Sequence, residues 1–190
     1  MQYIKGMQFY QNDKKTAITL GKFDGLHRGH ETLIERVIEH QKNDGVDSVV
    51  FAFDMAPLYE KIKKKKESLI TNEERAGRLF GRVDYLVECP FVEAVSKIEA
   101  ETFIKEILVK QFHAKYIVVG TDFHFGYQKK GDYHMLQQYS GEYGYEVEVI
   151  EKKCYEDREI SSTYIKEEVK KGNIKLVTQL LGYPYTVTGE

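Results

Sequence analysis

The stretch Gly21-Lys22-Phe23-Asp24-Gly25-Leu26-His27-Arg28-Gly29-His30 follows a short apolar run at 17–20 and precedes a segment with helical periodicity. Its three glycines allow a tight turn and a close approach of the backbone to a ligand. Two histidines three residues apart lie within one turn of the opening helix and face the same point. Since a helix N-terminus offers free N–H groups and a partial positive charge, the stretch predicts a phosphate site. The alternative is an ordinary turn with two surface histidines, and the complete G-x-F-D-G-x-H-x-G-H pattern argues against it.

The composition predicts one globular domain with small-molecule partners. The 190 residues are 42% hydrophobic and 31% charged, as in soluble proteins. A formal net charge of −2 gives no reason to expect a nucleic-acid-binding surface. The first residues lack the apolar core of a signal peptide, and no apolar run approaches the ~18 residues that span a membrane. Two cysteines, Cys89 and Cys154, form no disulfide framework and favour a reducing, cytoplasmic setting.

Strand candidates alternate with helical segments, which is the pattern of a parallel sheet covered on both faces. We predict an α/β fold with a Rossmann-like, doubly wound, five-stranded parallel sheet in the order 3-2-1-4-5. The strands are expected at 17–20, 48–53, 84–87, 115–119 and 145–150. Helices are expected at about 29–42, from Thr71, at about 99–112, after Asp132, and at about 162–171 and 173–181. At Thr71, a carboxylate three residues beyond the hydroxyl predicts a capping box.

Two loops are expected to meet at one crevice. In a doubly wound sheet the ligand lies beyond the carboxyl ends of the strands, where the winding reverses. With the predicted order, the loops after strands one and four flank that point, and the second loop is Val119-Gly120-Thr121-Asp122-Phe123-His124-Phe125-Gly126. Asp122 can accept from an amine or a ring N–H, and Phe123 or Phe125 can line a ring pocket. The alternatives are a turn-capping Asp122 and phenylalanines that pack in the core, and His124 is expected to be a surface residue.

A third set of residues, Ser161-Ser162-Thr163 with Lys166 one turn later, stands at a predicted helix N-terminus. Hydroxyls and a cation in this position would bind a further part of a polyphosphate, although Ser-Ser-Thr is also a common helix cap. No nucleophile and base are arranged for covalent catalysis. The pair His27 and His30 lacks the third ligand that zinc needs, so no metal ligand is assigned. The remaining chemistry is electrostatic stabilisation around a phosphorus centre.

Two segments fall outside these motifs. The run 61–66 holds five lysines, which predicts a solvated mobile loop or, alternatively, a flexible lid over a polyphosphate. Residues 183–190 follow the last predicted helix as an extended tail. We therefore expect a domain at 1–182 and a linker or tail at 183–190.

The segment 21–30 resembles the nucleotidyltransferase superfamily, whose mark is the paired-histidine H-x-G-H. Together with V-G-x-D-F-x-F-G at 119–126, G-D at 131–132 and I-S-S-T-x-I at 160–165, it resembles the FMN adenylyltransferase (FAD synthetase) module of the prokaryotic bifunctional riboflavin kinase/FAD synthetases. The likeness runs from about residue 1 to 185. It implies a nucleotidyltransferase-type fold and the transfer of AMP from ATP to FMN, giving FAD and pyrophosphate with Mg²⁺.

The resemblance also implies residue roles. His27 and His30 would stabilise the charge on the transferring phosphate and the departing pyrophosphate, and Lys166 would assist. The residues implied in ATP binding are Gly21, Lys22, Phe23, Asp24, Gly25, Gly29, His30, Ser161, Ser162 and Thr163. Those implied in the nucleotide and flavin pocket are Gly120, Asp122, Phe123, Phe125, Gly126 and Asp132.

The chain departs from the family pattern in three ways. The family's F-D-P-H-P is replaced by Phe53-Asp54-Met55-Ala56-Pro57, which changes the flavin side. Lys166 replaces an arginine, so a bidentate phosphate contact becomes a point charge. The riboflavin kinase domain is absent, so we expect no kinase activity, and a longer parent chain would carry that domain covalently. A nucleotidyltransferase for another phosphorylated acceptor and a non-catalytic flavin- or nucleotide-binding module remain open alternatives.

Overall fold

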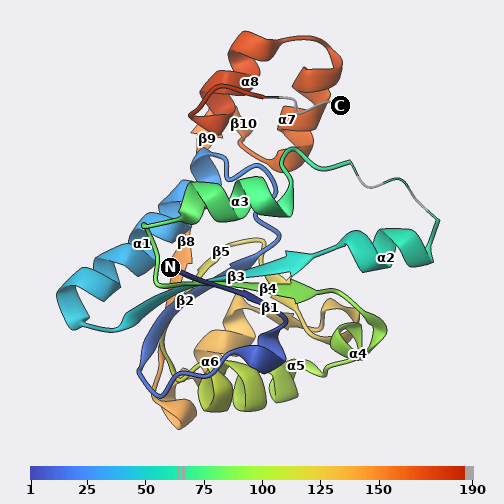
Figure 1. Ribbon diagram of the computed structural model, residues 1–190. Helices are drawn as coiled ribbons and strands as arrows, with labels where there is room; N and C mark the ends of the chain where they lie inside the picture. Colours follow the sequence, from blue (N-terminus) through green and yellow to red (C-terminus); the bar gives the residue numbers. More distant parts are fainter. Residues whose placement is uncertain (64, 66, 187–190) are drawn as a thin grey trace.

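A six-stranded parallel sheet forms the centre of the computed structural model, which describes residues 1–63, 65 and 67–186 (Figure 1). The order is β1-β4-β3-β2-β5-β8, and every neighbouring pair is parallel. The strands are β1 (Gln2–Lys5), β2 (Thr16–Gly21), β3 (Asp47–Asp54), β4 (Tyr85–Pro90), β5 (Ala114–Gly120) and β8 (Glu146–Ile150). The predicted order 3-2-1-4-5 is confirmed by β4-β3-β2-β5-β8, whereas the predicted number of five strands is wrong.

The missed strand is β1, which pairs with β4 at the edge of the sheet, from Gln2 opposite Tyr85 to Lys5 opposite Glu88. Its four side chains are exposed or half-buried. A short edge strand therefore carries no continuous apolar run of the kind that marks the buried strands of a parallel sheet.

Helices cover both faces of the sheet (Figure 1). One face carries α1 (Arg28–Asp44) and α3 (Asn72–Leu79), and the other carries the π-helix η2 (Phe103–Gln111) and α6 (Tyr133–Tyr143). Strand β3 serves both cores because its side chains alternate: Phe51 packs with the η2 side, and Val50 packs with the α1 side. The apolar residues of both cores are fully or nearly fully buried.

Two helix predictions have different outcomes. The capping box at Thr71 is confirmed, because its hydroxyl accepts from Glu74 N at 3.1 Å and Glu74 Oε2 accepts from Thr71 N at 2.7 Å. The segment expected as one helix at 99–112 consists of α5 (Ala100–Thr102) followed by η2. Its large apolar side chains are buried: Phe103, Ile104, Ile107, Leu108 and Phe112. Over the nine residues of η2, the apolar positions of an α-helix and a π-helix differ too little for the pattern to distinguish them.

Smaller elements complete the chain: η1 (Met7–Phe9), α2 (Ala56–Lys61), α4 (Glu93–Ser96), β6 (His124–Phe125), η3 (Tyr127–Lys129), β7 (Gly131–Asp132), β9 (Cys154–Tyr155) and β10 (Arg158–Glu159). After them, α7 (Ser162–Lys170) and α8 (Ile174–Leu181) form a layer of their own beyond α3 (Figure 1). Its core contains Ile165, Val177 and Leu180 together with Leu69 from the segment before α3. Ser162 Oγ, at the start of α7, donates to Asp24 O in the loop after β2 at 2.7 Å, so the N-terminus of α7 lies close to the carboxyl end of that strand.

Two predicted segments are only partly described. In the lysine run, Lys61 forms an ion pair with Glu93 at 2.7 Å, whereas Lys64 and Lys66 lie outside the described residues. The loop and lid interpretations therefore stay predictions. In the predicted tail, residues 187–190 lie outside the described part of the chain, while Tyr183 and Tyr185 pack against the apolar core of the α7–α8 layer.

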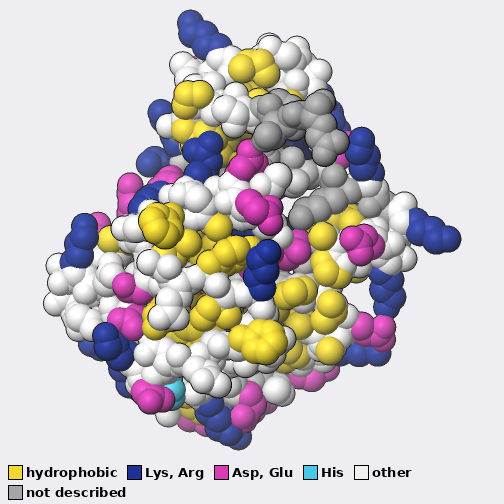
Figure 2. Space-filling model, viewed as in Figure 1, with side chains coloured by type: hydrophobic (Ala, Val, Ile, Leu, Met, Phe, Trp, Pro, Cys, Tyr) yellow, Lys and Arg dark blue, Asp and Glu magenta, His cyan; other side chains and the backbone are white. Residues whose placement is uncertain are grey.

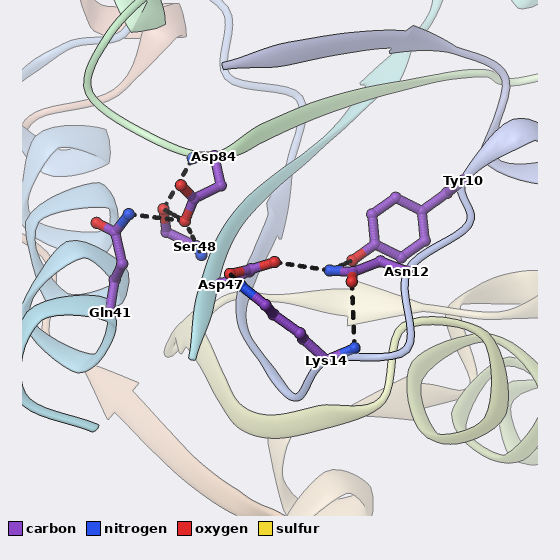
Figure 3. Close-up of polar contacts among 7 residues, drawn as sticks. All are labelled: Tyr10, Asn12, Lys14, Gln41, Asp47, Ser48 and Asp84. Carbon is purple, nitrogen blue, oxygen red and sulfur yellow. Dashed lines mark hydrogen bonds and ion pairs between the residues drawn. The ribbon is translucent and has the colours of Figure 1, made fainter. Parts of the chain in front are cut away.

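Polar contacts hold the amino ends of the strands together (Figure 3). Asp84 Oδ2 accepts from Gln41 Nε2 at 2.7 Å and from Ser48 N and Oγ at 2.8 and 3.0 Å. Asp47 accepts from Asn12 at 2.8 Å and contacts Lys14 at 3.3 Å. Because the chain's own side chains engage these carboxylates, this end of the sheet is closed by internal contacts.

The face of the molecule drawn in Figure 2 carries interspersed positive and negative side chains around apolar residues. On this face the cations do not merge into one broad basic area, in line with the formal net charge of −2. Among the described residues, no helix combines the length and the apolar character needed to cross a bilayer.

Candidate functional site

The turn 21–27 lies where the sheet reverses its winding. Strand β2 pairs with β3 on one side and with β5 on the other, so the loops after β2 and β5 leave the sheet side by side. The carboxylates of Asp24, in the first loop, and Asp122, in the second, both act on the pKa of His27. The two loops therefore meet at the predicted crevice.

The turn itself has an unusual backbone. Phe23 and Leu26 have φ values of 48° and 40°, in the left-handed region that side chains other than glycine rarely adopt. Gly25 has a φ of 88°, and a Cβ there would lie 2.7 Å from Leu69 Cδ1. The side chains of Phe23 and Leu26 are buried, so packing holds this strained conformation, and any contact of Phe23 with a nucleotide would use its backbone.

Two histidines stand at the start of α1. His27 is the N-cap residue and His30 is in the first turn; their rings stack with centroids 3.7 Å apart. The ring of Phe23 lies 5.1 Å from that of His30. Within the described part of the chain, the Nδ1 atoms of both histidines are buried without a hydrogen-bond partner. The Nδ1 atom of each ring therefore forms no hydrogen bond with any of the described residues.

Burial also sets the charge of the two rings. It lowers the pKa of His27 to about 4, although the charges of Asp24 and Asp122 oppose this effect. The pKa of His30 lies well below its usual value because of burial, with further effects from His27 and Arg75. Near pH 7 both imidazoles are therefore neutral, and they act as hydrogen-bond donors and acceptors rather than as cations.

A cleft of about 200 Å³ opens beside the turn. It supplies cationic, carboxylate and hydroxyl groups as well as apolar surface. Its lining includes Lys22, Asp24, Asn72, Arg75, Ser162, Thr163 and Lys166, together with Phe53, Met55, Tyr59 and Ile70. Phe53, Asp54 and Met55 belong to the segment that departs from the family pattern, so that departure lies in the wall of the cleft.

Asp24 connects three segments around this cleft. Its Oδ2 lies 2.5 Å from Lys166 Nζ, its Oδ1 accepts from Leu69 N at 2.7 Å, and its carbonyl oxygen accepts from Ser162 Oγ at 2.7 Å. The turn and the start of α7 are thus brought together as predicted. The carboxylate offsets the charge of Lys166, so a phosphate would compete with Asp24 for this lysine.

The remaining residues of the first and third motifs occupy distinct places. Ser161 caps α7 by accepting from Tyr164 N at 3.2 Å, whereas Thr163 is exposed and lines the cleft. Gly21 ends β2, and a Cβ on Gly29 would lie 3.2 Å from the His27 ring and 3.6 Å from Ile160 O. The lack of a side chain at Gly29 therefore permits the close approach of α1, His27 and the start of the third motif.

The loop after β5 divides into an exposed and a buried part. Asp122 is exposed and forms an ion pair with Lys152 at 3.1 Å, and Gly120 precedes it at the end of β5. Phe123 is partly buried and stacks on Phe125, with ring centroids 5.6 Å apart. Phe125 belongs to the main core, in agreement with the packing alternative for this residue.

Gly126 and Asp132 hold this loop against its neighbours. Gly126 has a φ of 75°, and a Cβ there would lie 2.7 Å from Ala100 Cα. Asp132 caps α6 by accepting from Met135 N at 3.0 Å. None of the six residues predicted for the nucleotide and flavin pocket lines the 200 Å³ cleft. Their role in a pocket stays a prediction.

A buried polar network that the sequence did not reveal reaches the cleft through Asn72 and Arg75. Arg75, which is 4% exposed, donates to Asn72 Oδ1 at 3.0 Å, to Glu88 Oε2 at 3.3 Å and to Lys22 O at 3.3 Å. Glu88, 5% exposed, also accepts from Tyr3 in β1 at 2.5 Å. The only signal in the sequence is that Arg75 stands four residues before Leu79, on the face of α3 that is buried.

This fold, with a strained turn and a histidine pair at the switch point of the sheet, defines an α/β domain of the nucleotidyltransferase type. The model of a family described as FAD synthetase matches residues 9–164. The chain therefore belongs to the FAD synthetase family.

Relatives and solved structures agree with this assignment. The chain is 31% identical over 175 residues to the bifunctional riboflavin kinase/FMN adenylyltransferase of Escherichia coli (strain K12), covering 91% of this chain and 56% of that protein. It is 30% identical over 192 residues to the protein of the same name from Haemophilus influenzae, covering 100% and 62%. The chain thus spans about three fifths of the length of these relatives.

Among solved structures, one named a macrolide-efflux protein, from Streptococcus pneumoniae, matches with a TM-score of 0.84 and 26% identity, covering 100% of this chain and 66% of that one. A pantothenate synthetase from Thermus thermophilus matches with a TM-score of 0.51 and 16% identity, covering 96% and 81%. The second likeness concerns the fold alone.

Proposed function

We propose that this chain transfers AMP from ATP to FMN, forming FAD and releasing pyrophosphate. The observation that carries the proposal is the stacked pair His27 and His30 at the opening of α1, in a member of the FAD synthetase family. The two histidines do not line the cleft themselves, but they follow directly on the turn whose Lys22 and Asp24 do. In the reaction, an oxygen of the FMN phosphate forms a bond to the α-phosphorus of ATP. The bond from that phosphorus to the bridging oxygen breaks, and pyrophosphate leaves with the electron pair.

The two imidazoles would act as donors to oxygens on which charge accumulates. Because both rings are neutral near pH 7, each can place one N–H on a phosphate oxygen, and the first N–H groups of α1 add further donors. Lys166 and Thr163, from the start of α7, would bind the pyrophosphate part. Such donors stabilise the transition state without forming a covalent bond to the protein.

Magnesium would enter with ATP as part of the substrate. Magnesium is commonly bound through phosphate oxygens, waters and only one or two carboxylates. The residue set fits this mode, since Asp24 is a carboxylate in the wall of the cleft, whereas no group of three His, Cys, Asp or Glu within the described ranges could hold a metal by itself.

The acceptor side is proposed to combine the loop at 120–123 with the apolar wall of the cleft. Gly120, Asp122 and Phe123 stay the predicted ring contacts, and Phe53, Met55 and Ile70 are added because they line the cleft. A nucleotidyltransferase for another phosphorylated acceptor is the second candidate, favoured by the altered segment at 53–57 in this wall.

The relatives' names also state riboflavin kinase activity. We do not expect that activity from this chain, because the proposed site accounts for adenylyl transfer only. We also propose that a longer parent chain carries a kinase domain covalently. We further propose a reducing cytoplasmic setting, which the two free cysteines favour.

The test is incubation of the purified protein with FMN, ATP and Mg²⁺, with FAD and pyrophosphate both quantified. We expect the two products in equal amounts. For changes of the two site histidines, His113→Asn is the matched control, since His113 precedes β5 at the opposite end of the sheet. The activity of His113→Asn should equal that of the wild type. Turnover of another phosphorylated acceptor but not FMN would select the second candidate. Binding of FMN and ATP without product would instead indicate a non-catalytic module.

A further inference from the structure

The strained turn is held from outside by hydrogen bonds from four separate segments. Three residues of the turn accept these bonds. Lys22 O accepts from Arg75 at 3.3 Å, and Gly25 O accepts from Tyr183 Oη at 2.5 Å. Asp24 accepts twice, through its carbonyl oxygen from Ser162 Oγ and through Oδ1 from Leu69 N, both at 2.7 Å. The last bond spans 158 residues of sequence. A backbone with non-glycine residues at positive φ persists only where its surroundings over-determine it, which is the case here.

Tyr183 is itself held in place on both sides. It follows Gly182, which ends α8 with a φ of 86° and turns the chain back toward the start of α1, where a Cβ on Gly182 would lie 3.4 Å from Arg28 Cγ. The Arg78 guanidinium lies over the Tyr183 ring, 3.4 Å from its centroid. Burial raises the pKa of Tyr183 to about 12, so the hydroxyl remains a donor throughout the neutral range.

The Gly25 carbonyl, which accepts the bond from Tyr183, controls the orientation of the next peptide N–H in the turn. The carbonyl of Gly25 and the N–H of Leu26 belong to one planar peptide, in which the two groups point in opposite directions. A donor that fixes the carbonyl therefore also fixes the direction of this N–H, one residue before His27. Since the turn and the first residues of α1 form the proposed phosphate site, a rotated peptide here would misplace a donor next to the histidine pair.

We propose that Tyr183 is a positioning residue for nucleotide binding: its hydroxyl holds the Gly25–Leu26 peptide, and with it the turn 21–27, in the conformation that accepts the triphosphate of ATP. The inference rests on the proposed function, because it assumes that the turn binds ATP. Tyr183 touches no reacting atom and acts through the backbone of the turn.

The expected effect follows from a shift of population. Without the hydroxyl, the turn spends part of its time in other conformations, and the apparent affinity for ATP falls by the fraction that remains competent. The loss of one hydrogen bond shifts the conformational equilibrium of the turn by about fivefold, so the decrease in apparent affinity is at most about fivefold. Once ATP is bound, the turn is restored, so the rate at saturating ATP should change by less than about twofold.

The experiment compares wild type, Tyr183→Phe and a matched control, Tyr155→Phe. Phenylalanine keeps the ring under Arg78 and removes only the hydroxyl. Tyr155 also donates its hydroxyl in the α7–α8 layer, to Gln179 Oε1 at 3.1 Å, without contacting the turn. Hydrogen exchange of peptides covering 22–30 reports on the turn without any ligand, and titration with MgATP in the absence of FMN reports on affinity.

We expect faster exchange at 22–30 and weaker ATP binding, by up to about fivefold, in Tyr183→Phe only. Unchanged exchange and affinity in Tyr183→Phe, or equal changes in Tyr155→Phe, would overturn the inference. Should Tyr183→Phe not fold, Arg78→Met, which removes the cation from the ring, must weaken ATP binding in the same direction for the inference to stand. Failure of the proposed function is detected separately, because the wild type would then form no FAD from FMN, ATP and Mg²⁺. The inference falls with it only where the wild type also binds no MgATP.

Discussion

His27 is expected to make the folded state sensitive to acid, and the size of the effect follows from its burial. The folded protein holds the pKa of His27 at about 4, whereas an exposed histidine in the unfolded chain titrates near 6.5. Below pH 6.5 the unfolded chain therefore binds a proton that the folded protein does not bind. Stability due to this residue is fully present above pH 6.5 and is lost as the pH falls toward 4.

The difference between the two pKa values corresponds to a loss of about 2 kcal/mol between pH 7 and pH 5, and of about 3 kcal/mol by pH 4. Carboxylates also contribute to acid unfolding, so the effect of His27 must be isolated by comparison. The assay is urea unfolding at pH 7 and pH 5 for wild type and His27→Gln, with the exposed His124 changed to Gln as a control.

Wild type and His124→Gln should lose about 2 kcal/mol more than His27→Gln between these pH values. The low pKa of His30 adds a loss of the same sign, which remains in His27→Gln. Equal losses in wild type and His27→Gln would mean that His27 titrates normally in the folded protein. The burial of the His27 ring, which the structure gives as the cause of its low pKa, would then be refuted.

Three further changes test other parts of the site and fold. His30→Ala should lower kcat for FAD formation by roughly 100-fold or more, since a lost transition-state donor costs about 3 kcal/mol, and an unchanged kcat would remove His30 from the mechanism. Arg75→Met should lower the free energy of unfolding by about 3–5 kcal/mol, because it leaves the Glu88 carboxylate buried without a cation. A loss below about 1 kcal/mol in urea unfolding would contradict this expectation. Gly126→Ala should destabilise the fold by more than about 1 kcal/mol, because φ is positive at this position and Ala100 blocks the Cβ. The control Gly77→Ala in α3, where the space is open, should be neutral or stabilising. Similar thermal unfolding of the two variants would disprove the steric argument.

The predictions that the structure confirms rest on local sequence patterns. The capping box at Thr71 involves residues three apart, so it is a property of a few consecutive side chains. The parallel direction of the five predicted strands follows from the alternation of strands and helices, because parallel strands need crossover connections. The meeting of His27 and His30 follows from their spacing of three residues, which places one at the N-cap and the other in the first turn of α1.

The contacts that make these patterns into a site could not be predicted in the same way. Arg75 looks like one more charged residue in a Glu-Glu-Arg helix, and only the packing of α3 on the sheet buries it against Glu88. The ion pair of Asp24 with Lys166 spans 142 residues, and nothing near Asp24 in the sequence indicates it.

Spacing within a few residues was enough to predict the five strands other than β1, the main helices and the two loops that follow the central strands. The charge state of the histidines, the ion pair of Lys166 with Asp24 and the bond from Tyr183 to the turn depend on the tertiary structure. The physical reason is that desolvation and hydrogen bonding depend on which distant side chains are brought within about 3 Å, and residues far apart in the chain become neighbours only when the whole core packs.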